Sequence, residues 1–136
     1  MSVFHLAYHV TNLDEAREFY GNILGCVEGR STDTWVDFDF FGHQISLHLG
    51  EPFKTTNTGK VGDHMVPMPH MGVVLDKPEW DILAKKLTDR GVNFILSPTT
   101  RFAGEPGEQS TMFFYDPSGN PIEVKGFADG KGIFSK

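Results

Sequence analysis

One pattern of elements occurs twice in this chain, and the repeat constrains the fold more than any other feature. Each half opens with a short apolar, strand-like run that contains a histidine, His5 in the first half and His70 in the second. A segment with the apolar spacing of a helix follows and ends at Gly25 in one half and at Gly91 in the other. The spacing between the two histidines nearly equals that between the two glycines, so the sequence predicts two copies of one unit.

Three extended stretches follow each predicted helix. They cover residues 26–31, 34–40 and 44–49 in the first half, and 92–96, 111–115 and 121–125 in the second. The unit is therefore βαβββ, taken twice, which predicts an α+β fold: repeat one at about 3–50, a linker at about 51–68 and repeat two at about 69–127, within one domain of residues 1–136. Each helix covers only one face of its sheet, so we expect the two units to form a curved mixed sheet that encloses a concave site.

Charge and hydropathy exclude several classes of partner. The formal net charge of -6 leaves no basic stripe for nucleic acid or for an anionic membrane surface. No apolar stretch approaches the ~20 residues that span a bilayer, and the N-terminus does not resemble a secretion signal. The single cysteine, Cys26, cannot form an intrachain disulfide. We therefore expect a cytoplasmic protein that acts on a small molecule.

The repeat also places potential metal ligands at related positions. His5 and His70 open the two halves, and Glu123 lies within the last predicted strand between two apolar neighbours. Two imidazoles and one carboxylate suit a divalent Fe, Mn, Co, Ni or Zn ion with coordination positions left for substrate. Burying Glu123 without a cation or a hydrogen-bond partner would be costly, so a metal explains its position.

These residues, with the turn cluster after the fifth of the six stretches, resemble the vicinal oxygen chelate superfamily. That superfamily includes glyoxalase I, extradiol ring-cleaving dioxygenases, methylmalonyl-CoA epimerase, and the fosfomycin and bleomycin resistance proteins. The motifs that carry the resemblance are His5, Phe19-Tyr20, Leu24-Gly25, His70 and residues 116–123. The segment from Glu51 to Met68 matches least. The resemblance implies a metal that coordinates adjacent oxygens of a substrate, but it does not fix the reaction.

Aligning the two hairpins on their turn glycines places Ser46 at the position of Glu123. Proteins that resemble glyoxalase I usually have a second carboxylate at that equivalent position, whereas serine is a poor ligand. A site of His5, His70 and Glu123 with the fourth position vacated looks more like an extradiol dioxygenase. Fe(II) is therefore the favoured cofactor, with Mn, Ni, Co and Zn as possible alternatives.

His48 is the candidate catalytic residue. It lies two residues beyond Ser46 on the same strand, so both side chains face the same side of the sheet. Unperturbed imidazole has a pKa of ~6.5, which suits a general acid-base group. Two other interpretations stay open: His48 is a fourth ligand if the hairpin register differs by two residues, or it is structural.

Four residues of the second half are candidates for substrate binding: Arg101, Gln109, Thr111 and Phe113. Arg101 follows the fourth stretch and suits a bidentate contact with a substrate carboxylate. The other three alternate along one strand, which places them on one face. In the alternative, Arg101 is solvated and the strand residues face the helix.

The sequence favours a non-haem iron dioxygenase of the extradiol type acting on a small vicinal-oxygen substrate. The alternative enzyme is a lyase like glyoxalase I or an epimerase-type isomerase. A third class, a resistance protein that sequesters a drug such as bleomycin, needs no metal, so the three ligands oppose it. We expect a homodimer, and the repeat suits a metal site within one chain as well as one shared between two chains.

Overall fold

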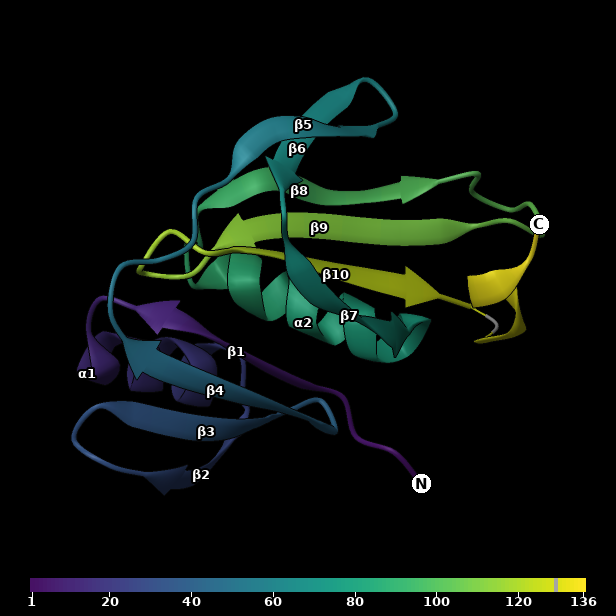
Figure 1. Cartoon of the computed structure of the whole chain (residues 1–136). Helices are drawn as coiled ribbons and strands as arrows, with labels where there is room; N and C mark the ends of the chain where they lie inside the picture. The colour runs from purple at the N-terminus through teal and green to yellow at the C-terminus, as the bar shows by residue number, and fades with distance from the viewer. Residues whose placement is uncertain (129) are drawn as a thin grey trace. The chain divides into compact units, whose positions relative to one another are not determined.

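The structure, a computed structural model, describes residues 1–128 and 130–136. The chain divides into two compact units, which are described separately. The first unit consists of residues 1–54 with the turn at 116–120, and the second consists of residues 55–115 and 121–136. Each unit contains one four-stranded sheet, and the second also contains a two-stranded hairpin (Figure 1).

The first sheet has the strand order β1-β4-β3-β2. Its elements are β1 (His5–Val10), α1 (Leu13–Ala16), the π-helical turn η1 (Arg17–Ile23), β2 (Val27–Ser31), β3 (Trp35–Phe40) and β4 (His43–Leu49). Strand β1 runs parallel to β4, and the other neighbours are antiparallel. The Asn12 side chain accepts a hydrogen bond from the Glu15 amide at 2.9 Å and thereby caps the helix start. The predicted single helix is therefore present as an α-helical turn that continues as a π-helix.

The second sheet repeats this topology with the order β7-β10-β9-β8. Its elements are β7 (Met71–Asp76), α2 (Lys77–Asp89), β8 (Phe94–Arg101), β9 (Gln109–Tyr115) and β10 (Pro121–Phe127), followed by the 3-10 turn η2 (Gly130–Phe134). Strand β7 is parallel to β10, as β1 is to β4. The predicted α+β fold with two βαβββ copies is confirmed.

Helix α2 packs on one face of the second sheet through Trp80. The indole nitrogen of Trp80 donates a hydrogen bond to the Val124 carbonyl at 2.8 Å, and a Cβ on Gly126 would lie 2.7 Å from the Trp80 side chain. Gly126 therefore faces α2. Because side chains alternate along a strand, Glu123 and Lys125 face the opposite, helix-free side.

The stretch predicted as a linker contains a β-hairpin. Strands β5 (Thr56–Val61) and β6 (His64–Met68) pair in antiparallel fashion around Gly62, which has a φ of 59°. A two-residue connection that contains a positive-φ glycine is typical of a β-hairpin. Val66, 1% exposed, packs against Leu96 and Phe113. The hairpin thus covers part of the helix-free face of the second sheet.

The strand register confirms the alignment of the two repeats. Ser46 pairs with Ala7 across β4 and β1, and Glu123 pairs with Gly72 across β10 and β7. Ala7 and Gly72 each lie two residues after the histidine of their unit. Ser46 is therefore the counterpart of Glu123.

In the described part of the chain no helix is long and apolar enough to cross a membrane.

Candidate functional site

The helix-free face of the second sheet and the β5–β6 hairpin enclose a cavity of about 380 Å³. Its lining includes His70, Glu123, Thr111, Gln109 and Arg101, all of which were singled out from the sequence. The register explains how the strands bring them together: Glu123 is opposite Phe113, Lys125 is opposite Thr111, and Arg101 is opposite Gln109. The cavity lies entirely within the second unit.

Glu123 is the acidic group of this cavity, and it is only 9% exposed. One carboxylate oxygen, Oε2, accepts a hydrogen bond from the Thr111 hydroxyl at 2.6 Å. The other, Oε1, lies 3.2 Å from His70 Nε2. The Thr111 contact has the short distance of a hydroxyl bound to an ionised carboxylate, so it fixes the orientation of Glu123.

The His70 ring is oriented by contacts on its other side. Its Nδ1 atom lies 2.7 Å from the Pro67 carbonyl oxygen, and a carbonyl only accepts hydrogen bonds, so Nδ1 carries a proton. The ring also makes an edge contact with Phe113, with centroids 4.9 Å apart. In the neutral ring, Nε2 then presents a lone pair to the Glu123 carboxylate. Two facing lone pairs need a proton or a cation between them, and a backbone carbonyl on Nδ1 is the usual support for a metal-binding histidine.

Phe113 does not have the place expected for a substrate contact. It is on the predicted face, but Val66 and Leu96 cover it and it is fully buried. We correct its role from contacting substrate to supporting the His70 ring. Thr111, 5% exposed, likewise serves Glu123 through its hydroxyl. Arg101 and Gln109 are half-buried at the cavity wall, where a ligand can reach them.

The first unit holds the remaining predicted residues. His5 is exposed at the start of β1. Ser46 is buried, and its hydroxyl donates a hydrogen bond to the carboxylate of Asp37, which is also buried. Sequence reasoning missed Asp37, although its alternation with the apolar residues of β3 places it on the same face as Ser46.

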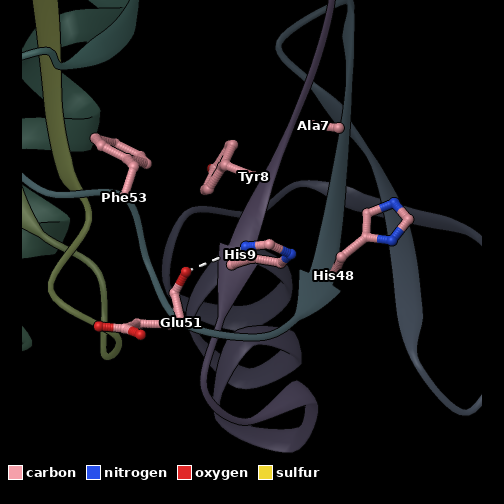
Figure 2. A pocket seen from close by; sticks show the side chains of 6 residues that line it. All are labelled: Ala7, Tyr8, His9, His48, Glu51 and Phe53. Carbon is pink, nitrogen blue, oxygen red and sulfur yellow. Dashed lines mark hydrogen bonds between the residues drawn. The ribbon is translucent and has the colours of Figure 1, made fainter.

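His48 lines a second cavity, of about 460 Å³, within the first unit (Figure 2). Its ring stacks on Trp35 with the centroids 6.2 Å apart. His9 is the direct neighbour of His48 across β1 and β4, and its Nδ1 lies 3.1 Å from the Glu51 carbonyl oxygen. A Cβ on Gly50 would lie 2.6 Å from the His9 ring, so a glycine is needed there.

Tyr8 borders the same cavity and belongs to a buried hydrogen-bonded chain. The hydroxyl groups of Tyr8 and Tyr20 lie 2.8 Å apart, and Tyr20 donates to Asp116 at 2.7 Å. Burial raises the pKa of each of the two tyrosines well above the usual value for a tyrosine. Asp116 also accepts the Ser118 and Asn120 amides, each at 2.8 Å, which closes the turn predicted at 116–120.

Within residues 1–128 and 130–136, no three His, Cys, Asp or Glu side chains converge as a group that could hold a metal ion. The structure does bring together the pair His70 and Glu123 in the second unit. Their protonation pattern and burial fit two ligands of a divalent ion.

The chain belongs to the Glyoxalase/Bleomycin resistance protein/Dioxygenase superfamily, whose model matches residues 2–124. This confirms the family resemblance seen in the sequence. Members of the superfamily typically bind divalent metal ions, act on small molecules and often form oligomers.

Three relatives illustrate the similarity. The crystal structure of a glyoxalase/bleomycin resistance protein/dioxygenase from Alicyclobacillus acidocaldarius is 33% identical, with a TM-score of 0.76 over 98% of this chain and 96% of that one. The protein named Glyoxylase I 4 from Arabidopsis thaliana is 28% identical over 134 residues, covering 90% of this chain and 69% of that protein. The fosfomycin resistance protein FosX from Listeria monocytogenes, 16% identical with a TM-score of 0.67 over 98% of both chains, shares the fold.

Proposed function

We propose that this chain is a metal-dependent enzyme in which His70 and Glu123 are two of the metal ligands. The observation that supports this is the His70 ring: the Pro67 carbonyl holds its Nδ1 proton, and Nε2 faces the buried carboxylate at 3.2 Å. His5, on β1 of the first unit, remains the predicted third ligand. A divalent ion, bound by these residues, would supply a Lewis acid for two adjacent oxygens of a substrate.

The chain's own residues prepare that site. Thr111 orients the Glu123 carboxylate, and Phe113 holds the edge of the His70 ring. The hairpin strand β6 contributes the Pro67 carbonyl, which contacts the His70 ring, and the buried Val66, which packs against Phe113. Such support restricts the motion of ligands that must be placed accurately.

The reaction we place first is extradiol-type dioxygenation with Fe(II), on a small substrate with vicinal oxygens. Its support is the repeat register, which assigns serine to the position equivalent to Glu123, and the engagement of that serine with Asp37. His48 is the proposed acid-base residue. The alternative is a lyase or isomerase like glyoxalase I, and it is favoured by the Arabidopsis relative, whose name refers to that activity.

Metal analysis tests the ligand assignment. Elemental analysis should show that each of three purified variants has lost the stoichiometric metal that we expect in the parent protein: His70→Ala, Glu123→Ala and His5→Ala. Each variant should retain the far-UV circular dichroism spectrum of the parent. The matched control is His64→Ala, because His64 is exposed on β6 and does not line the cavity. Full metal occupancy in a variant would remove that residue from the ligand set. A parent protein that binds no divalent metal would instead favour the sequestering class.

Substrate panels separate the two reactions. Fe(II)-loaded protein should consume dioxygen with a catechol-like or other vicinal diol substrate. Isomerisation of hemithioacetals or exchange of an α-proton, without oxygen uptake on a broad panel, would assign the lyase or isomerase class. The cytoplasmic location and the homodimer remain predictions, and light scattering of the purified chain tests the latter.

A further inference from the structure

The second-unit cavity has a cationic wall that the metal site does not require. Lys60 on β5, Arg101 on β8 and Lys125 on β10 line it, and among the residues that the structure describes Glu123 is the only acidic one in the lining. Among the described residues none of these three cations forms an ion pair, whereas Arg17, Lys77 and Lys85 each pair with a carboxylate. In a chain with a net charge of -6, three unpaired cations around one cavity are an uneven distribution of charge.

The register places two of these cations, Lys125 and Arg101, away from Glu123 along the sheet. Lys125 follows Glu123 by two residues on β10, which is ~6 to 7 Å along a strand, and both face the helix-free side. Arg101 pairs with Gln109. Gln109 lies two residues from Thr111, the partner of Lys125, so Arg101 is one two-residue step farther from Glu123 than Lys125 is. The His70–Glu123 pair therefore occupies one end of the cavity, and the positive charge lies toward the other.

Arg101 is held in a way that leaves it able to bind a ligand. Its guanidinium carbon lies 5.1 Å from the centroid of the Phe102 ring, so the aromatic ring supports the cation. An arginine held by a ring still offers the edge N–H groups that match the two oxygens of a carboxylate or phosphate. The Gln109 side chain lies beside it at the cavity wall.

We infer that this end of the cavity binds an oxyanionic group of the substrate, a carboxylate or a phosphate. Arg101 makes the bidentate contact, while Lys60 and Lys125 supply point charges. This inference rests on the proposed function for the identity of the other end, where the vicinal oxygens would bind. The substrate is then a small anionic molecule whose oxyanion is separated from its vicinal oxygens by one to two two-residue strand steps, ~7 to 13 Å. The cavity of about 380 Å³ suits a molecule of that size.

Calorimetry with simple probes tests the anion site. Benzoate, phenyl phosphate and the neutral benzamide are titrated into the full chain at low ionic strength. We expect the two anions to bind and benzamide to bind at least about 10-fold more weakly, since hydrogen bonds to charged groups are worth about that factor or more. Added salt should weaken only the anions. The stronger of the two anions identifies the oxyanion. Equal affinity for benzoate and benzamide, or no anion binding at millimolar concentration, overturns the inference.

Variants assign the site to its residues. Arg101→Gln should lower anion affinity about 10- to 100-fold, Lys125→Gln about 10-fold, and Arg101→Lys should retain part of the affinity lost in Arg101→Gln because it keeps the charge but loses the planar fork. The matched control is Lys85→Gln, which removes one positive charge from an exposed pair with Asp89 on α2 and should bind anions normally. Unchanged affinity in both Arg101→Gln and Lys125→Gln refutes the assignment.

Metal content separates this inference from the proposed function. Arg101→Gln should retain its metal, because Arg101 is not a ligand, while losing anion affinity. If His70→Ala keeps its full metal content, the assignment of His70 as a metal ligand fails. The anion titrations still test the anion site independently in that case. Circular dichroism of each variant confirms that the fold is intact.

Discussion

Removal of the Thr111 hydroxyl tests most directly whether the cavity is organised around Glu123. Thr111→Val keeps the shape of the side chain and deletes the donor that lies 2.6 Å from Glu123 Oε2. Both side chains are buried, at 5% and 9% exposure, so water cannot readily replace the lost bond. A hydrogen bond to a charged group contributes about 1.5 to 3 kcal/mol, and the free energy of unfolding should fall by that amount.

Two measurements follow from this magnitude. A chain of 136 residues gains ~0.29 kcal/mol/K of unfolding entropy at its midpoint, so a loss of about 2 kcal/mol corresponds to a fall in Tm of roughly 7 °C in the metal-free protein. Metal affinity, measured by calorimetric titration, should fall about 10- to 100-fold, the usual effect of removing a group that orients a ligand.

The matched control for this variant is Thr99→Val on the neighbouring strand. Thr99 pairs with Thr111 in the sheet, but its hydroxyl donates to the Ser97 carbonyl at 2.7 Å in an exposed position. It should therefore leave metal affinity unchanged and Tm nearly so. If Thr111→Val binds metal within twofold of the parent protein, the carboxylate is not oriented by Thr111, and the reasoning about the cavity is refuted.

Three further predictions concern other parts of the structure. Gly72→Ala should prevent correct pairing of β7 with β10, because a Cβ there would lie 1.6 Å from the Glu123 carbonyl oxygen; a native-like melting curve would contradict this. His48→Ala should lower turnover ~10²- to 10⁴-fold at unchanged metal content, and metal loss would make His48 a ligand. Because burial raises the pKa of Tyr8 and Tyr20, both stay protonated in the fold while the unfolded chain ionises near pH ~10. Their contribution to stability is thus present below that pH and lost above it. In denaturant titrations at alkaline pH, Tyr8→Phe should therefore reduce the fall in the free energy of unfolding by about 1.4 kcal/mol per pH unit. An unchanged slope of the free energy of unfolding against pH would refute the argument.

Periodicity was sufficient to predict the repeated unit. Apolar spacing located both helices and the three strands that follow each of them within a few residues. The turn glycines aligned Ser46 with Glu123, as the pairing register does. These features depend on local patterns: alternation in strands, a 3.6-residue period in helices, and positive φ at Gly25, Gly91 and Gly119. A repeat makes such patterns more reliable, because each copy supports the interpretation of the other.

Tertiary contacts explain what the sequence did not reveal. Alternation placed Phe113 on the face of Glu123, as the register has it, but it could not show that Val66 from the supposed linker would cover Phe113. The same hairpin supplies the Pro67 carbonyl that fixes the protonation of His70. The hydrogen bond from Ser46 to Asp37 likewise joins two strands and has no signature in either strand alone.

The two repeats share a buried hydroxyl–carboxylate pair on the helix-free face, yet they distribute it differently. In the first unit the hydroxyl, Ser46, lies on the strand that pairs with β1, and the carboxylate is on β3. In the second unit the carboxylate, Glu123, takes the Ser46 position, and the hydroxyl of Thr111 is on β9. Only this second arrangement sets the carboxylate beside the anchored histidine. The β5–β6 hairpin then covers part of that face and contributes Lys60 to the cavity lining. The position of one carboxylate and the presence of one hairpin therefore distinguish the second unit, in which we propose two of the metal ligands and the anion-binding groups, from the first.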